Sequence, residues 1–136
     1  MAGYYPDILR VAMPTARSNG ESAPDLGLLQ GTLDVMILKA LSWGPMHGFA
    51  VAKWIRLTTD DVLQIDDGAL YPALHRMEHR GLIDADWDLT ENNRRAKYYR
   101  LTTKGRQQLR ARTSSWDRYS SAVSKVIHST VQPSVS

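Results

Sequence analysis

The chain has 136 residues, enough for one domain with a modest core. It has no cysteine, which excludes a disulfide scaffold and a zinc site built on thiolates. Its apolar runs are far shorter than the roughly 20 residues of a membrane-spanning helix, and its start lacks the apolar segment of a signal peptide. We therefore expect a cytoplasmic protein with no membrane partner.

The net charge is only +3, but the charges are unevenly distributed. Residues 90–112 carry eight basic side chains and one acidic side chain, whereas residues 1–89 carry seven basic and twelve acidic ones. A basic block of this size is often a solvated helix face, and it is also the footprint that phosphate binding requires. Charge alone leaves both interpretations open.

Residues 1–26 contain three prolines, two glycines and several small polar residues, and we expect a flexible N-terminal arm there. Since little before Met13 is typical of a structural element, the pattern leaves open whether the start is Met1 or Met13.

Two helices are expected next along the chain. Apolar residues at helical spacing predict a helix over 32–43, capped by Thr32 and ended by a Gly-Pro pair. A second helix is predicted over 46–58, with Phe49, Ala52 and Ile55 on its inner side and Val51 as a further candidate.

A short strand-like piece, residues 62–65, precedes a third helix. Asp66 or Asp67 is a suitable N-cap for this helix, and Gly81 is the usual residue just past a C-terminus. The spacing predicts an inward stripe made of Leu70, Ala73, Leu74 and Met77.

A hairpin and a last helix complete the pattern. Apolar residues alternate with aspartates over 82–89, which predicts a half-buried strand, and β-forming residues over 96–101 make the return strand. Thr102 then caps a helix over 102–130, and residues 131–136 are expected to be a disordered tail.

The last helix carries apolar and aromatic residues at alternating spacings of three and four, interrupted by Arg112. Little of its own domain remains for it to cover, so we expect an interface with a second copy. Folding back on its own domain is the alternative. The expected dimerisation residues are Leu109, Trp116, Tyr119, Val123 and Val126.

Four segments, "LLQGTLDVMILKAL", "GPMHGFAVAKWI", "GALYPALHRMEHRGLIDADW" and "NNRRAKYYRLTTKGRQQL", resemble the PadR family of transcriptional regulators, over about residues 28–129. The resemblance implies an α+β, mainly α fold: a winged helix-turn-helix over 27–101 with a long C-terminal dimerisation helix, as in the short PadR subfamily. It further implies a homodimer that binds double-stranded operator DNA, usually as a repressor. In some members a small, often aromatic, effector near the dimer interface weakens DNA binding.

The resemblance assigns the third helix to the major groove and the hairpin, as a wing, to the backbone or minor groove. The alternatives to DNA contact are that Tyr71 only packs against the domain, that Arg76 is simply solvated, and that the hairpin tip is an ordinary polar turn. The expected DNA-binding residues are Gly68, Tyr71, Pro72, His75 and Arg76 on the helix, and Asn92, Asn93, Arg94, Arg95 and Lys97 on the wing. The three aspartates of the first strand are expected to neutralise part of the basic block across the hairpin.

Pro72 stands inside the third helix, where its missing N–H and its ring oppose a regular helix. It lies outside the apolar stripe. We therefore expect its ring to face outward beside Tyr71, where an apolar, donor-free group can meet a thymine methyl or a sugar.

No catalytic constellation or cofactor motif is present in the sequence, and we expect no enzyme. His75 and His79 have a metal-ligand spacing, but the residue after the first is Arg76 and no third ligand is nearby, so no metal is expected. A tryptophan in such a row of helix residues is more often part of a core than a platform for a ligand. In a two-fold dimer, however, Trp116 could border a slot for a planar effector. A winged-helix protein-interaction module without operator binding is the alternative function.

Overall fold

The computed structural model describes residues 26–134, with side chains from residue 31 onward. The expected N-terminal arm and the choice between Met1 and Met13 therefore lie outside the described residues, apart from the arm's last residue. The end of the expected tail, residues 135–136, lies outside them as well.

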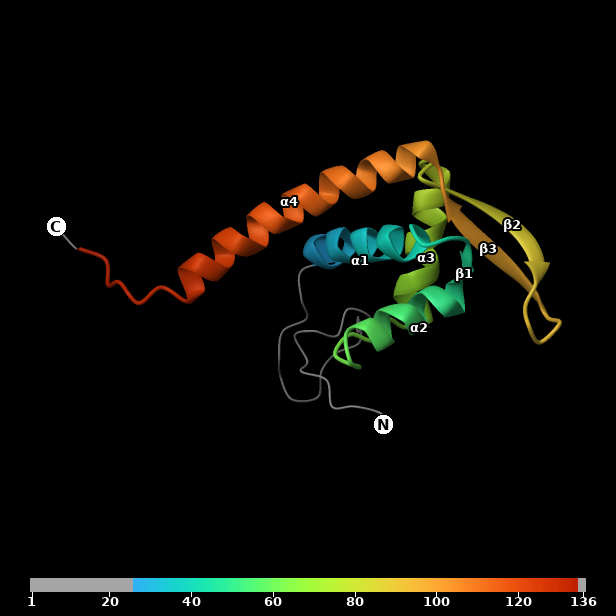
Figure 1. Cartoon of the computed structure of the whole chain (residues 1–136), viewed down its shortest axis with the longest axis horizontal. Coiled ribbons are helices and arrows are strands. Elements are labelled where there is room, and N and C mark those ends of the chain that lie inside the picture. Colours follow the sequence, from blue (N-terminus) through green and yellow to red (C-terminus); the bar gives the residue numbers. More distant parts are fainter. Residues whose placement is uncertain (1–25, 135–136) are drawn as a thin grey trace.

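Four helices and three strands make up this part of the chain (Figure 1). The strands form one antiparallel sheet in the order β1-β3-β2. The elements in chain order are α1 (Leu26–Leu41), β1 (Met46–His47), α2 (Gly48–Thr58), α3 (Asp67–His79), β2 (Ile83–Leu89), β3 (Arg95–Leu101) and α4 (Thr103–Ile127). This is the mainly helical α+β fold that the sequence predicted, a winged helix followed by a long C-terminal helix.

The boundaries near the N-terminus differ from those expected. α1 begins at Leu26, so Thr32 lies inside the helix and is not its N-cap. Residues 62–65 form a loop rather than a strand, and Ile65 from this loop is buried in the core. The sheet gains a strand elsewhere: β1, which precedes α2, pairs its two residues with β3. A two-residue strand depends on its distant partner, so the local sequence carries no signal for it.

The core lies where α1, α2, α3 and the base of the hairpin meet, and its largest fully buried side chains include Ile37, Leu38, Leu70 and Leu74. Phe49, expected on the inner side of α2, is 69% exposed. Gly48, Val51 and Ile55 are buried on the inner side of α2, and Ala52 is partly buried against the core as expected. Phe49 lies about 100° around the helix from Gly48 and therefore outside this inner side.

The hairpin of β2 and β3 is half-buried only at its base. Ile83 is buried and Ala85 is partly covered, whereas Trp87 and Leu89 on the same face of β2 are exposed. The hairpin projects from the body as a wing (Figure 1), and its outer half therefore leaves the core behind.

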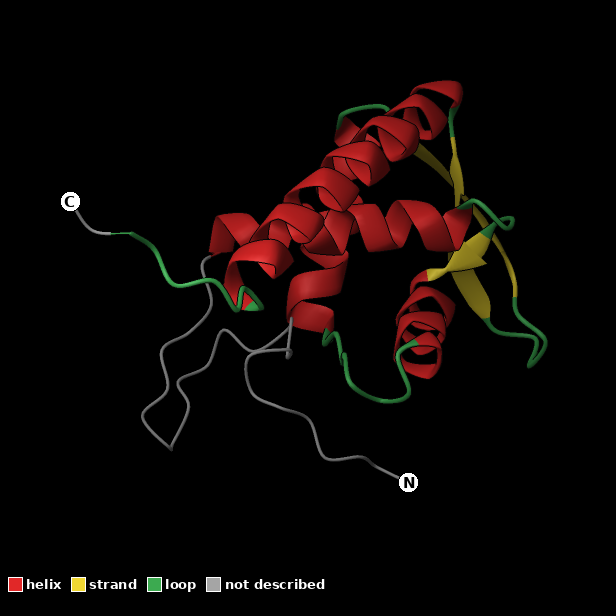
Figure 2. Ribbon diagram, turned by 60° about the vertical axis from the view of Figure 1, so that its left-hand side comes forward, coloured by secondary structure: helices red, strands yellow, loops and turns green. Residues whose placement is uncertain are grey.

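α4 starts against the body and then extends away from it (Figures 1 and 2). Thr102 is its N-cap as predicted, because the Thr102 hydroxyl accepts a hydrogen bond from the Gly105 N–H at 3.0 Å. The helix ends at Ile127, slightly earlier than expected. None of the helices within residues 26–134 is long and apolar enough to span a bilayer.

Candidate nucleic-acid interface and dimerisation face

α3 has two distinct faces. Its four predicted inward residues are all buried, and its outer face presents Gly68, Tyr71, Pro72 and His75 to solvent. Asp66 is the N-cap, with its carboxylate accepting a hydrogen bond from the Ala69 N–H at 3.1 Å. Just after the end of the helix, Gly81 adopts a φ of +75°, a conformation that disfavours residues other than glycine.

Tyr71 is both packed and exposed. Its ring lies so close to Gly48 of α2 that a β-carbon on Gly48 would be 2.8 Å from Tyr71 Cε1, while 42% of the residue remains exposed. Partial burial, reinforced by the carboxylate of Asp67, raises the pKa of the Tyr71 phenol. Since an ordinary phenol, with a pKa of about 10, is already neutral at pH 7, the Tyr71 hydroxyl can donate a hydrogen bond.

The residues before α2 support this arrangement. Nδ1 of His47 accepts a hydrogen bond from the Ala50 N–H at 3.1 Å, which makes His47 the N-cap of α2. The same ring meets Tyr98 of β3 edge-on, with 5.3 Å between ring centroids. The His-Gly pair thus caps α2, anchors it to the sheet and leaves room for Tyr71.

Pro72 is exposed on the outer face of α3, as its position outside the apolar stripe predicted. Since proline has no N–H, the carbonyl of Gly68 lacks the hydrogen bond that residue 72 normally donates. The irregularity thus falls on the solvent side of the helix and leaves its packed side intact.

The tip of the wing is a closed turn that displays polar and basic side chains. Thr90 N–H donates to the Arg94 carbonyl at 2.8 Å, and Asn93, with a φ of +64°, donates its N–H to the Thr90 carbonyl at 2.9 Å. The exposed residues of the tip are Glu91, Asn92, Asn93, Arg94 and Arg95. The guanidinium of Arg95 lies over the Trp87 ring at 4.8 Å from its centroid.

The two faces of the wing differ in charge. One face turns toward α3, since Lys97 Nζ lies 3.1 Å from Glu78 Oε1. On the other face Asp86 pairs with Arg100 at 2.8 Å, and this hydrogen bond raises the Arg100 pKa. The predicted neutralisation across the hairpin therefore holds for Arg100, whereas Lys97 is paired with a residue of α3.

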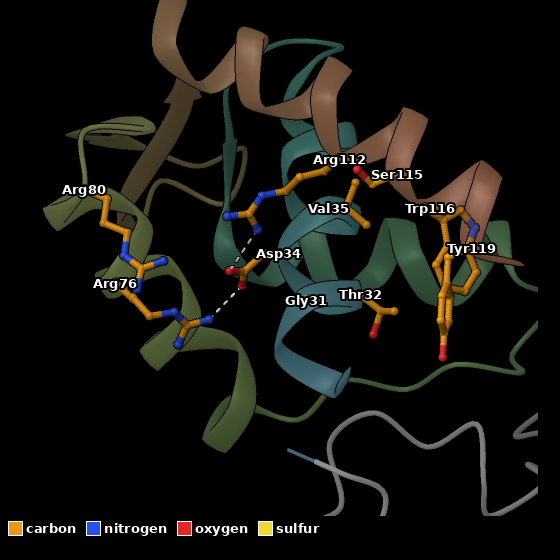
Figure 3. A pocket seen from close by; sticks show the side chains of 10 residues that line it. All are labelled: Gly31, Thr32, Asp34, Val35, Arg76, Arg80, Arg112, Ser115, Trp116 and Tyr119. Carbon is orange, nitrogen blue, oxygen red and sulfur yellow. Dashed lines mark hydrogen bonds and ion pairs between the residues drawn. The ribbon is translucent and has the colours of Figure 1, made fainter. Parts of the chain in front are cut away.

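Arg76 occupies a different environment from the rest of the predicted DNA-binding residues. Its Nη2 lies 2.7 Å from Oδ1 of Asp34 on α1, so its charge is engaged inside the domain (Figure 3). We therefore leave Arg76 out of the proposed DNA-binding face and keep it as part of the packing between helices.

The expected dimerisation residues fall into two groups. Leu109 is partly buried against the core of its own domain. The other four, which we call the distal row of α4, are exposed to differing degrees: Trp116, Tyr119, Val123 and Val126. The rings of Trp116 and Tyr119 lie 6.4 Å apart, centroid to centroid.

An open hollow lies between α1, α3 and α4 (Figure 3). Arg76, Arg80 and Arg112 line one part of it, and Trp116 and Tyr119 line the other. Within residues 26–134, no three histidine or acidic side chains are grouped as metal ligands would be, and His75 and His79 are both exposed on α3.

Sequence reasoning missed three residues of this region: Asp34, Gly48 and Trp87. Asp34 stands among apolar residues of a helical stripe, an anomaly that could have marked it as paired. Gly48 opens a helix directly after a capping residue, a weaker signal. Trp87 belongs to the face that the sequence predicts to be half-buried, and only the projection of the wing leaves it exposed, with Arg95 over its ring.

Residues 37–111 match the transcriptional regulator PadR-like family. A solved transcriptional regulator from Clostridium thermocellum is 30% identical, with a TM-score of 0.63 over 78% of this chain and 99% of that one. A PadR family transcriptional regulator from Eggerthella lenta is also 30% identical, with a TM-score of 0.64 over 77% and 89%. A PadR-like regulator from Bacillus cereus is 26% identical, with a TM-score of 0.64 over 75% and 97%.

Proposed function

The chain belongs to the PadR-like family of transcriptional regulators, which are not enzymes, and we propose that it is a homodimeric repressor that reads an approximately palindromic operator. The observation that carries the proposal is the outer face of α3. Four residues outside its buried stripe stand exposed together: Gly68, Tyr71, Pro72 and His75.

α3 supplies the chemistry of base reading. The protonated Tyr71 hydroxyl is a donor, His75 is a further polar group, and the Pro72 ring is an apolar surface suited to a thymine methyl. The small Gly68 allows a close approach of DNA, whereas the carboxylates of Asp66 and Asp67 beside it serve the cap of the helix rather than a contact with phosphate. These properties support insertion of this face in the major groove.

The wing supplies contacts to the DNA backbone. Arg94 and Arg95 at its tip are exposed and have no acidic ion-pair partner among the pairs formed within residues 26–134. The acidic face of the hairpin points away from Lys97, which supports an approach of DNA from the side of α3 and Lys97. Asn92 and Asn93 at the tip can add neutral contacts to phosphate or to the minor groove.

The distal row of α4 supports dimerisation. It is apolar, aromatic and spaced for helix packing, and the rest of the described chain leaves it exposed. Two copies joined through this row would present two α3 helices about one DNA turn apart, as a palindromic site requires.

Trp116 supports a further element of the proposal, a small aromatic effector. It borders the hollow beside the distal row, where a planar molecule between two copies could stack on it. Such a ligand would release the operator if it favours an arrangement of the two copies that DNA does not accept.

The test is a gel shift with DNA from the promoter region of the protein's own gene. We expect a specific complex that weakens steeply with salt, and a large loss of affinity in Tyr71→Ala. Arg94→Ala/Arg95→Ala removes four positive charges per dimer, which lowers the slope of log affinity against log salt by about 3 to 4. Arg106→Ala/Arg110→Ala, which removes equal charge from exposed positions on α4, is the matched control.

The alternative is a winged-helix interaction module without operator binding. A protein that binds promoter DNA no better than unrelated DNA, or that is a monomer in light scattering, would favour the module and end the repressor proposal. Titration with aromatic compounds, followed by Trp116 fluorescence in a variant lacking the other tryptophans, tests the effector separately.

A further inference from the structure

Asp34 is the one buried charged residue within the described side chains, at 4% exposed. Its Oδ1 lies 2.7 Å from Arg76 Nη2 and its Oδ2 lies 3.4 Å from Arg112 Nη1 (Figure 3). One carboxylate on α1 therefore holds a guanidinium from α3 and another from α4.

A buried carboxylate stays charged only when it is paired, and removal of a partner leaves a charge without compensation. Each of the three groups thus depends on the position of the other two. Arg76 also lies behind the exposed face of α3, and Arg112 lies directly before the distal row of α4. The bridge consequently connects the part of the molecule that we propose reads DNA with the part that we propose forms the dimer.

A second connection joins α3 and α4 at the start of α4. The Thr102 hydroxyl donates to the Gly81 carbonyl at 2.7 Å, and the Thr102 N–H donates to the Leu82 carbonyl at 3.1 Å. A helix held at one end can still pivot about that end. Arg112 is ten residues further on, about 15 Å along the helix axis, so its contact with Asp34, together with the packing of Leu109 on the core, fixes the direction of α4 as well as its origin.

We propose that Asp34 is a positioning residue for operator reading, which sets the angle between α3 and α4 and thereby the spacing of the two α3 helices in the dimer. This inference rests on the proposed function. Half of the 25-residue α4 is about 19 Å long, so a rotation of about 10° displaces its end by about 3 Å. That displacement is close to the rise of one base pair, about 3.4 Å.

Asp34→Asn tests the proposal because asparagine keeps the shape of the side chain and removes its charge. Operator DNA is prepared with the natural separation of half-sites and with one base pair added or removed. The wild type should prefer the natural spacing strongly, whereas Asp34→Asn should lose about tenfold of that preference. Asp117→Asn, an exposed aspartate of α4, is the matched control and should behave as the wild type does.

An unchanged spacing preference in Asp34→Asn would overturn the proposal, and so would an equal loss of affinity at every spacing, which marks a merely structural residue. Circular dichroism and light scattering establish that the variant is folded and dimeric under the assay conditions. If Asp34→Asn does not fold, Arg112→Lys, which keeps the charge and removes the guanidinium fork, is expected to shift the preference in the same direction.

A measurement without DNA separates this inference from the proposed function. Since the chain has no cysteine, spin labels can be placed on His79→Cys in α3 and Lys125→Cys in α4, both exposed. The distance between the labels within one chain should broaden or shift by several ångström in Asp34→Asn. An unchanged distance distribution would contradict the positioning role even for a protein that binds no operator.

Discussion

The two halves of α4 share one helix and one periodic pattern, but they have different environments. Up to Arg112 the helix belongs to its own domain: Gly105 is buried, Leu109 packs on the core, and Arg112 pairs with Asp34. Beyond Arg112 the same spacing continues in Trp116 and the rest of the distal row, which are exposed. The periodicity predicts a contact face, and the extent of the domain decides which partner that face has.

The largest effect is expected at Gly105, where the first half of α4 is held most tightly. A β-carbon there would collide with the carbonyl oxygen of Leu82, which is backbone and cannot move aside easily. We expect Gly105→Ala to lower the free energy of unfolding by about 2 to 3 kcal/mol, measured by urea denaturation.

Gly31→Ala is the control for Gly105→Ala, because Gly31 is also helical but has open space around its β-carbon position. It should stabilise the protein by up to about 1 kcal/mol. A Gly105→Ala protein as stable as Gly31→Ala would show that the start of α4 is not held as described.

The second prediction compares one substitution in each half of α4. Trp116→Ala should dissociate the proposed dimer and leave the unfolding free energy of the monomer nearly unchanged, because the ring is largely outside the core. Leu109→Ala should lower monomer stability by about 2 kcal/mol, because Leu109 packs on the core. Light scattering over a concentration series and urea denaturation measure the two quantities, and equal effects of both substitutions would remove the distinction.

α3 also combines a packed side and an exposed side within one turn of helix, and a substitution of Pro72 tests this division. Pro72→Ala restores a hydrogen-bond donor for the Gly68 carbonyl, so the variant should be at least as stable as the wild type. It should also alter the preference among operator variants, because the apolar ring is lost from the outer face. Selection from randomised operators compares the two proteins. Unchanged preference with raised stability would make Pro72 a tolerated irregularity.

The smallest effect is the titration of the tyrosines. Burial is the main cause that raises the pKa of both Tyr71 and Tyr99. Their neutral forms therefore stabilise the fold below the ordinary phenol pKa of about 10, and this contribution is lost as pH rises through the higher pKa of the folded state. In a pH titration followed by ultraviolet absorbance, some phenols should ionise at a higher pH than an ordinary tyrosine. Tyr71→Phe should remove one of these phenols. Ionisation of all tyrosines near pH 10 would contradict the packing of Tyr71.

The sequence by itself determined the elements whose signals are local. The inward stripe of α3, an aspartate cap at Asp66 or Asp67, the Gly81 stop, the hairpin and the Thr102 cap follow from patterns within a few residues, since caps and periodicity act over one or two helical turns. The structure identifies Asp66 as the cap. These elements were sufficient to place the outer face of α3 and the wing tip.

Only the tertiary structure decided what depends on residues far apart in the chain. Asp34 meets Arg76 across 42 positions and Arg112 across 78, so no local pattern could remove Arg76 from the DNA-binding face or show why Arg112 interrupts the row on α4. Phe49 is exposed because it lies on the outer side of α2, and Trp87 is exposed because it lies on the part of the wing that extends beyond the core. Burial and ion pairing depend on which surfaces meet in space, and the packing of the helices decides that.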